Sequence, residues 1–158
     1  MKKVKQLVLL ILFTIISISI SNKTYAHCEI PCGIYEDTLR IELIKEHIVT
    51  IEKSMKMIIK LSNEDTHDYN QIVRWVNNKE DHANKLQEVV SQYFLHQRIK
   101  PTSIENEELY TKYIKQLSLL HELLVYSMKT KQTTDLMYIE KLSTAVNAFE
   151  KIYFHRHD

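Results

Sequence analysis

Nine residues near the start of the chain, residues 27–35, concentrate the side chains that could bind a metal ion. They read HCEIPCGIY and hold both cysteines, the single glycine and one of the two prolines of the 158-residue sequence. Pro31 restricts φ, and Gly33 adopts backbone conformations denied to other residues, so the segment can curl and bring the thiolates of Cys28 and Cys32 to one side. Such a pair predicts either a site for a late transition metal or a Cys28–Cys32 disulfide.

Residues 1–26 have the composition of a secretory signal peptide. A basic MKKVK start is followed by about 14 apolar residues and by a polar stretch that ends at Ala26. The apolar run is shorter than the ~20 residues that a membrane-spanning helix needs, so we interpret it as a signal and not as a retained anchor. We expect a signal peptidase to cut after Ala26 and release an exported protein, periplasmic or secreted, that is no longer attached to the membrane.

Cleavage at that point would make His27 the first residue of the mature protein. Its free α-amine, whose ordinary pKa lies near 8, would then join its own imidazole and the two thiolates as possible ligands. Two thiolates beside an amine favour square-planar Ni(II), whereas a tetrahedral arrangement would suit Zn(II). We call residues 27–35 the hook. It brings only three side-chain ligands close together, whereas a structural zinc site usually has four.

The remaining residues, 36–158, carry the pattern of a helical protein. One glycine and two prolines are too few for a turn-rich β-sandwich or barrel. Apolar residues recur at spacings of three and four in four stretches. The four stripes are Ile41, Ile44, Ile48, Ile51, Met55 and Ile58; Tyr69, Ile72, Val76, Ala83, Leu86, Val90 and Tyr93; Leu109, Tyr113, Leu117, Leu120 and Leu124; and Ile139, Leu142, Val146, Phe149 and Tyr153. The pattern predicts an all-α fold, an antiparallel up-and-down four-helix bundle preceded by the hook.

Helix ends are indicated by capping and breaking residues. Asp37 is the predicted N-cap of the first helix, and Thr134 or Asp135 that of the fourth. The polar stretch 62–66 separates the first two helices, and Pro101 ends the second because the residue before a proline is disfavoured in helical geometry.

Charge and polar side chains outside the hook point to no other site. The 21 lysines and arginines balance 20 acidic residues, so no basic field favours nucleic acid. We interpret the polar run 77–82 as a solvated helix face, with a polar patch under a site as the alternative. The histidines are interpreted as solvated or core residues, and those at the end of the chain as part of a frayed tail. They are His47, His67, His82, His96, His121, His155 and His157.

The sequence H-C-x-x-P-C-G-x-Y at a processed N-terminus resembles the nickel hook of nickel-containing superoxide dismutases, a family of four-helix-bundle subunits. Residues 40–42, RIE, look like the family's R-I-E segment, reached here with one fewer intervening residue. Residues 91–94, SQYF, look like its S-D-Y-F segment, with Gln in place of Asp.

This resemblance implies a ligand set and a reaction. Nickel would be held by the His27 amine, the Cys28 amide nitrogen and thiolate, and the Cys32 thiolate, with the His27 imidazole as an axial ligand of the oxidised state. Superoxide would be converted to dioxygen and hydrogen peroxide by Ni(III)/Ni(II) cycling. Family members assemble as hexamers, so the resemblance also implies a homo-oligomer.

Further residues acquire roles from the same resemblance. Tyr35 matches the gate tyrosine over the open face of the metal, and Tyr93 matches a second tyrosine near the site; for both, packing against the bundle is the alternative. Glu42 matches the acid that hydrogen-bonds the axial imidazole, with an ordinary first-turn glutamate as the alternative. The arginine partner of that acid would fall near Asn78, which leaves the role empty or passes it to Arg74 or Lys79.

Two other functions stay open at this point. An exported nickel or copper carrier would use the same hook without turnover. A helical interaction protein would have Cys28 and Cys32 joined as a disulfide, with no metal bound.

Overall fold

The computed structural model describes residues 5–6 and 36–154 of the chain. The chain divides into two units, residues 1–30 and 31–158. Of the predicted signal peptide only residues 5–6 are described, and they are helical and exposed. The hook, residues 27–35, lies outside the described residues.

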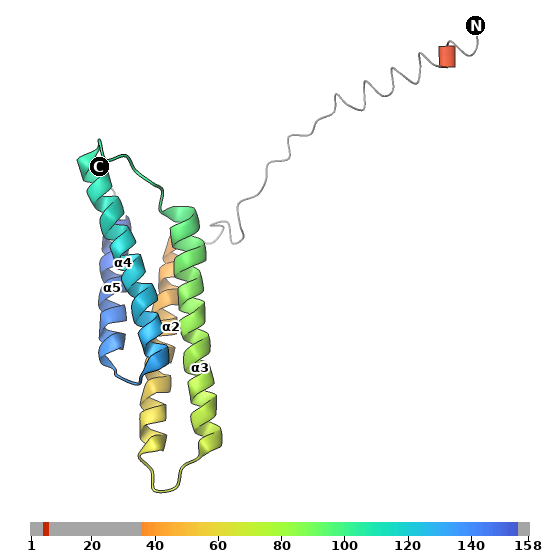
Figure 1. The fold of residues 1–158 in the computed structure, drawn as a ribbon, viewed down its shortest axis with the longest axis vertical. Helices are drawn as coiled ribbons and strands as arrows, with labels where there is room; N and C mark the ends of the chain where they lie inside the picture. The colour runs from red at the N-terminus through yellow and green to blue at the C-terminus, as the bar shows by residue number, and fades with distance from the viewer. Residues whose placement is uncertain (1–4, 7–35, 155–158) are drawn as a thin grey trace. The chain divides into compact units, whose positions relative to one another are not determined.

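Four helices in sequence form the bundle, and the described residues contain no strand. They are α2 (Asp37–Ser62), α3 (Tyr69–Glu88), which continues as the π-helix η1 (Val89–Arg98), α4 (Glu107–Gln132) and α5 (Met137–Phe154). Each helix packs against the next along the chain, and α2 packs against α5, which closes the ring. Successive helices run in opposite directions (Figure 1), so the predicted antiparallel four-helix bundle is confirmed.

Side chains of connecting residues cap three of the four helices. Asp68 accepts a hydrogen bond from the Gln71 amide, and Asn106 accepts one from the Leu109 amide. Asp135, one of the two predicted caps of the last helix, accepts a hydrogen bond from the Met137 amide. The prediction that Asp37 caps α2 was wrong. Asp37 is the first residue of the helix, and Glu36, which holds the N-cap position, makes no side-chain capping bond.

The predicted apolar stripes build most of the core. All six residues of the first stripe are buried on α2, and Leu86, Val90, Leu120, Leu142 and Phe149 join them from the other helices. Tyr69 and Leu109, however, are 72% and 51% exposed. Both lie in the first turn of a helix, where side chains lean back toward the N-terminus and so point past the end of the packed region.

The polar run 77–82 is not the fully solvated face that we predicted. Lys79 is only 4% exposed, and its ammonium donates to the Lys131 carbonyl in the last turn of α4 at 2.9 Å. Carbonyls in a helix's last turn lack intrahelical donors and carry partial negative charge, so a lysine there is stabilising. Asn78 donates to Ser54 on α2. The run therefore joins α3 to its neighbours.

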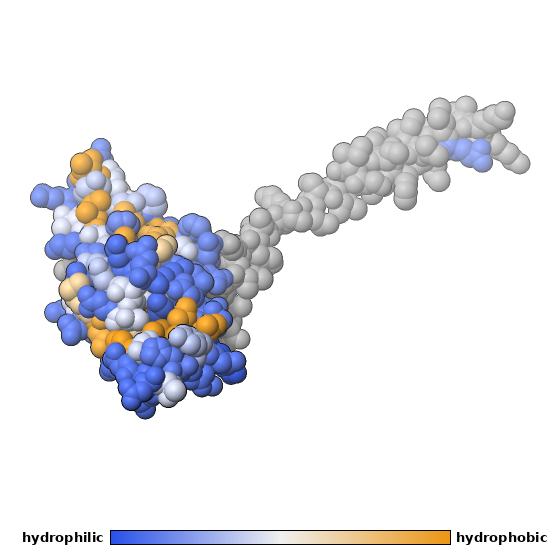
Figure 2. All heavy atoms as spheres, turned by 60° about the horizontal axis from the view of Figure 1, so that its bottom comes forward, coloured by the Kyte–Doolittle hydropathy of each residue, from blue (hydrophilic) through white to orange (hydrophobic). Residues whose placement is uncertain are grey.

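The outer surface of the bundle is mixed. Figure 2 shows one face as mainly hydrophilic with apolar side chains between the polar ones. Within the part of the chain that the structure describes, no helix is long and apolar enough to cross a membrane.

Candidate metal centre

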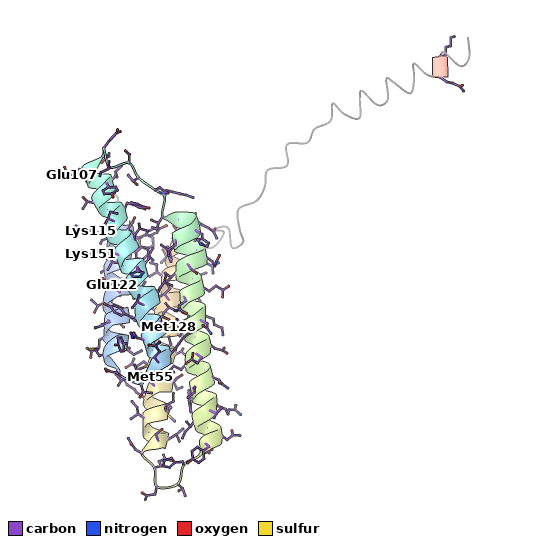
Figure 3. The ribbon with its side chains drawn as sticks, viewed as in Figure 1. Met55, Glu107, Lys115, Glu122, Met128 and Lys151 are labelled. Atoms are coloured by element: carbon purple, nitrogen blue, oxygen red, sulfur yellow. The ribbon has the colours of Figure 1, made fainter. Side chains whose placement is uncertain are left out.

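Two of the predicted site residues, Glu42 and Tyr93, belong to the described part of the chain. His27, Cys28, Cys32 and Tyr35 do not, so their predicted roles stay predictions. The hook is followed directly by α2, whose N-terminal end lies near the C-terminal ends of η1 and α5 (Figure 1). Figure 3 places Glu107, at the start of α4, at this end of the bundle, and Met55 toward the opposite end.

Tyr93 lies in a hydrogen-bonded group at this end, which we call the Asp37 cluster: the side chains of Asp37, Tyr93, Arg98 and Tyr153. The Tyr93 hydroxyl donates to Asp37 Oδ1 and accepts from Arg98 Nη2 at 2.9 Å. Arg98 Nε donates to the same Asp37 oxygen at 2.8 Å, and the Tyr153 hydroxyl donates to Asp37 Oδ2 at 2.6 Å. One carboxylate thus ties the start of α2 to the ends of η1 and α5.

The π-helix explains why Arg98 reaches Tyr93. In an α-helix, residues five apart point about 140° away from each other. In a π-helix each amide bonds to the carbonyl five residues earlier, so residues five apart lie nearly above one another. The Ile99 amide bonds in this way to the Phe94 carbonyl at 2.9 Å. The wider turn places the Arg98 guanidinium over the Tyr93 ring, 5.0 Å from its centroid.

Hydrogen bonding fixes the charges of the cluster. Burial alone would raise the pKa of Asp37, but hydrogen bonds from Tyr153, Tyr93 and Arg98 outweigh it and lower that pKa. Burial and the bond to Asp37 raise the pKa of Tyr93 and of Tyr153. Asp37 is therefore ionised at neutral pH, and both tyrosines keep their protons.

A second arginine, Arg40, lies beside the cluster without a hydrogen bond from its Nε. Its guanidinium stands 5.1 Å from the Tyr93 ring centroid, a cation–π distance. Arg40 Nε is buried and has no hydrogen-bond partner; no other buried side-chain nitrogen or oxygen among the described residues is in this position. Buried donors nearly always find an acceptor, so this one needs an explanation.

Aromatic packing supports the cluster from inside the bundle. The Phe94 ring packs edge-on against Tyr93 at 5.2 Å, Phe149 at 5.0 Å and Tyr153 at 5.5 Å. Phe94 and Phe149 are fully buried, and Tyr93 is 2% exposed. These rings leave the two tyrosines little freedom to rotate away from Asp37.

Glu42 is placed apart from this cluster. Its side chain is 57% exposed and accepts a hydrogen bond from Lys45 at 2.9 Å, while Lys45 also bonds Glu150 on α5. Glu42 lies in the second turn of α2, and the acidic residue of the first turn is Asp37. Among the described residues, the cation paired with Glu42 is thus Lys45.

The expected replacements for the family's arginine lie elsewhere. Asn78 bonds Ser54, twelve residues along α2 from Glu42, which is about 18 Å of helix. Lys79 is bonded to the α4 carbonyl, and Arg74 lines a groove with Thr50 and Trp75. None of these three side chains takes the expected place beside Glu42.

Two histidines that the sequence pattern left apart meet across α2 and α3. The Nδ1 atoms of His47 and His82 are 3.1 Å apart, and the rings are nearly perpendicular. Spacing along the chain gave no signal for this pair, because it depends on the register of two antiparallel helices. Over residues 5–6 and 36–154, no three His, Cys, Asp or Glu side chains form a group that could hold a metal ion.

Asp37, Arg98 and Tyr153 are the residues of the cluster that sequence reasoning missed as site residues, since Asp37 was predicted only as an N-cap. Tyr153 was predicted only as a member of the fourth apolar stripe. An arginine just before a proline-terminated helix end is the one signal that could have drawn attention to Arg98.

Comparison with known proteins assigns the chain to a family. The family model for nickel-containing superoxide dismutase matches residues 22–157, a range that includes the whole bundle. No curated protein and no solved structure matches the chain. Because the family model spans most of the sequence, the chain belongs to the family of nickel-containing superoxide dismutases.

Proposed function

We propose that this superoxide dismutase binds its nickel ion at the hook, through the His27 amine and imidazole and the thiolates of Cys28 and Cys32. The family is nickel-containing and acts on superoxide, so the enzyme is an oxidoreductase with nickel as its cofactor. The observation that carries the finer proposal is the sequence HCEIPCGIY at residues 27–35, inside the matched range and directly before α2.

The donor set fits nickel. Anionic thiolates and a nitrogen donor suit a late transition metal that must reach a higher oxidation state, whereas harder oxygen ligands would not. The described bundle offers no competing group of three ligands.

When bound, nickel supplies one-electron chemistry, cycling between Ni(III) and Ni(II) while one superoxide is oxidised to dioxygen and another, with two protons, is reduced to hydrogen peroxide. In the proposal Tyr35 and Tyr93 orient water or substrate, and Glu42 fixes the His27 imidazole. Tyr93 has one hydroxyl lone pair left after its bonds to Asp37 and Arg98. Its raised pKa suits it to orient a neighbouring group and not to give up its own proton.

Export is part of the same proposal. Only cleavage after Ala26 makes the His27 nitrogen a free amine, so maturation by signal peptidase would create a ligand of the metal site. The proposed enzyme is therefore periplasmic or secreted, and by family resemblance it is a homo-oligomer.

The proposal is tested with Cys28→Ser, Cys32→Ser and His27→Ala beside the parent protein, each exported and processed. Serine oxygen is a harder donor that seldom deprotonates, so both serine variants should lose nickel and superoxide removal while the bundle stays folded. His27→Ala keeps the amine and should retain nickel with reduced turnover. The measurements are nickel content, superoxide removal and the helical signal in circular dichroism.

Each contrary result has a defined meaning. Serine variants that keep both nickel and full activity would exclude the hook as the active site. A parent protein that binds nickel at the hook but does not remove superoxide would instead favour the carrier function.

A further inference from the structure

We propose that His47 and His82 form a second metal site, which binds a late first-row divalent cation and ties α2 to α3. The two Nδ1 atoms are the ligands, and water completes the coordination of the ion. Both residues belong to the described bundle, and neither belongs to the hook. The site therefore does not depend on where the nickel ion of the dismutase binds.

The separation of the two ring nitrogens suits a shared ion. Two nitrogens that each lie about 2.1 Å from one ion, at an angle between 90° and the tetrahedral value, stand about 3.0–3.4 Å apart. The Nδ1 atoms of His47 and His82 are 3.1 Å apart, and their ring planes meet at 77°. Nearly perpendicular rings can approach one ion from two directions without stacking on each other. The pair therefore has the spacing of two adjacent ligands.

The protons of the two rings leave lone pairs for a cation. Among the hydrogen bonds of the described residues, each of these Nδ1 atoms has only the other as its partner. A neutral imidazole carries a single N–H, and when its proton is on Nε2 the Nδ1 atom is an acceptor only. Two rings in that form turn their lone pairs toward each other, and a cation between them would make this arrangement favourable. Burial lowers the pKa of both rings, so they are neutral at pH 7.5.

The packing of α2 on α3 holds the two histidines in register. These helices lie side by side and run in opposite directions (Figure 1), and Asn78 of α3 donates to Ser54 of α2 at 2.9 Å. Ile48 and Ala83, which follow the two histidines in the sequence, are both buried in the core. Ligands on packed helices are already in place before the ion arrives, so little ordering opposes binding.

The donor type and the local charge select the ion. Imidazole nitrogen suits Cu(II), Ni(II) and Zn(II), whereas Mg(II) and Ca(II) prefer oxygen ligands. Both rings are half-buried, so water can reach the coordination positions that they leave open. The charges of Glu46 and Asp81 favour a cation at the rings, and the charge of Lys85 opposes it. These three side chains together leave one negative charge beside the pair.

The test titrates Zn(II) into the exported, processed protein and into His47→Gln, His82→Gln and His67→Gln. His67 is an exposed histidine in the connection between the same two helices, so His67→Gln is the matched control. All four proteins keep the hook, and zinc bound there is counted equally in each of them. The measurements are the number of zinc ions bound, their dissociation constants by calorimetry, and the change in melting temperature that zinc causes.

We expect His47→Gln and His82→Gln to lose one zinc site that the parent and His67→Gln retain. The residues that orient metal ligands are worth about 10- to 100-fold in affinity, so loss of one of two ligands should weaken this site at least tenfold. Zinc at about 100 times its dissociation constant should raise the melting temperature of the parent by about 5 °C, because the site exists only while the two helices are packed. This rise should shrink in both histidine variants and not in His67→Gln.

Two charge variants keep both rings and decide the question if a histidine variant does not fold. Lys85→Gln removes a repelling charge and should tighten zinc binding at this site about two- to fivefold, the size typical of exposed charges. Glu46→Gln removes an attracting charge and should weaken binding by a similar factor.

Zinc stoichiometry and melting temperatures that do not respond to either histidine substitution would overturn the second metal site. Equal zinc affinity in Lys85→Gln and Glu46→Gln would contradict it as well. An equal loss in His67→Gln and His82→Gln would show adventitious binding to surface histidines and would also refute the proposal.

Discussion

At the scale of single residues, Asp37 shows how hydrogen-bond donors from other helices can replace the expected role of a side chain in helix capping. An aspartate at a helix start is a good N-cap, because its carboxylate can accept from the free amides of the first turn. Here the carboxylate instead accepts from Arg98 and two tyrosine hydroxyls of other elements. A capping bond to this carboxylate would be charge-assisted as well, so the cluster prevails by the number of its donors, three on the two oxygens of Asp37.

The lowered pKa of Asp37 predicts how stability depends on acid. Since its folded pKa lies below the unfolded value of about 4, its contribution is complete above pH 4 and is lost as the pH falls through the folded pKa. Asp37→Asn should therefore cost about 2 kcal/mol at neutral pH, and the gap from the parent should narrow below pH 4. Urea unfolding of the metal-free proteins between pH 2.5 and 7 measures this. A gap that stays constant over this range would show that the charge of Asp37 does not stabilise the fold.

At the scale of elements, the sequence predicts the helices well, because a single 3.6-residue repeat of apolar residues describes most of each helix. The six apolar positions of α2 follow the 3.6-residue repeat, and all are buried. The π-helix η1 departs from that repeat, and neither the sequence of η1 nor its apolar spacing reveals the wider turn. The contact of Arg98 with Tyr93 was therefore out of reach, although Tyr93 itself was correctly placed on the apolar stripe.

The parts of the site that could be predicted are those that depend on chain order alone. Residues 27–35 form one continuous segment, so their donor types and spacing are visible in the sequence. Asp37, Tyr93 and Tyr153 come from three elements, and Lys79 finds its acceptor on a fourth. Side-chain contacts between helices depend on how the packed helices are rotated and on their register. Apolar periodicity constrains this rotation and register only to within a turn.

The contact of α2 with α3 through His47 and His82 gives a second pH dependence. Burial is the main cause that lowers the pKa of both rings. The charges of His82 and Lys85 lower the pKa of His47 further, and Lys85 also lowers the pKa of His82. Glu46 opposes the shift on each ring, and Asp81 opposes the shift on His82. The unfolded chain then binds more protons than the folded one just below pH 6.5, so stability rises with pH there and is lost on acidification.

His82→Gln should flatten this slope, because it removes one titrating ring and the charge felt by the other. His67→Gln, which removes an exposed histidine from the connection between the same helices, is the matched control. Melting temperatures between pH 5 and 7.5 provide the test. A slope unchanged in His82→Gln, or flattened equally in His67→Gln, would contradict the assignment to this pair.

At the scale of the whole molecule, the core of the described residues is built by the four helices of the bundle. The buried apolar cluster lies between Ile41 and Phe149, with contributions from all four helices. Folding of the bundle and binding of nickel should therefore be separable properties.

The N-terminus offers the sharpest test of this separation. One alanine inserted between Ala26 and His27, with processing still after Ala26, would turn the His27 amine into an amide, a far weaker donor, and would place a new amine one residue further from the thiolates. We expect superoxide removal to fall at least 100-fold while the metal-free melting temperature stays within about 1 °C of the parent, since no core residue changes. Mass spectrometry of the exported protein verifies the N-terminus, and metal analysis and activity follow. Full activity in a protein whose first residue is the added alanine would refute ligation by the His27 amine, and a large fall in melting temperature would show that the hook stabilises the bundle after all.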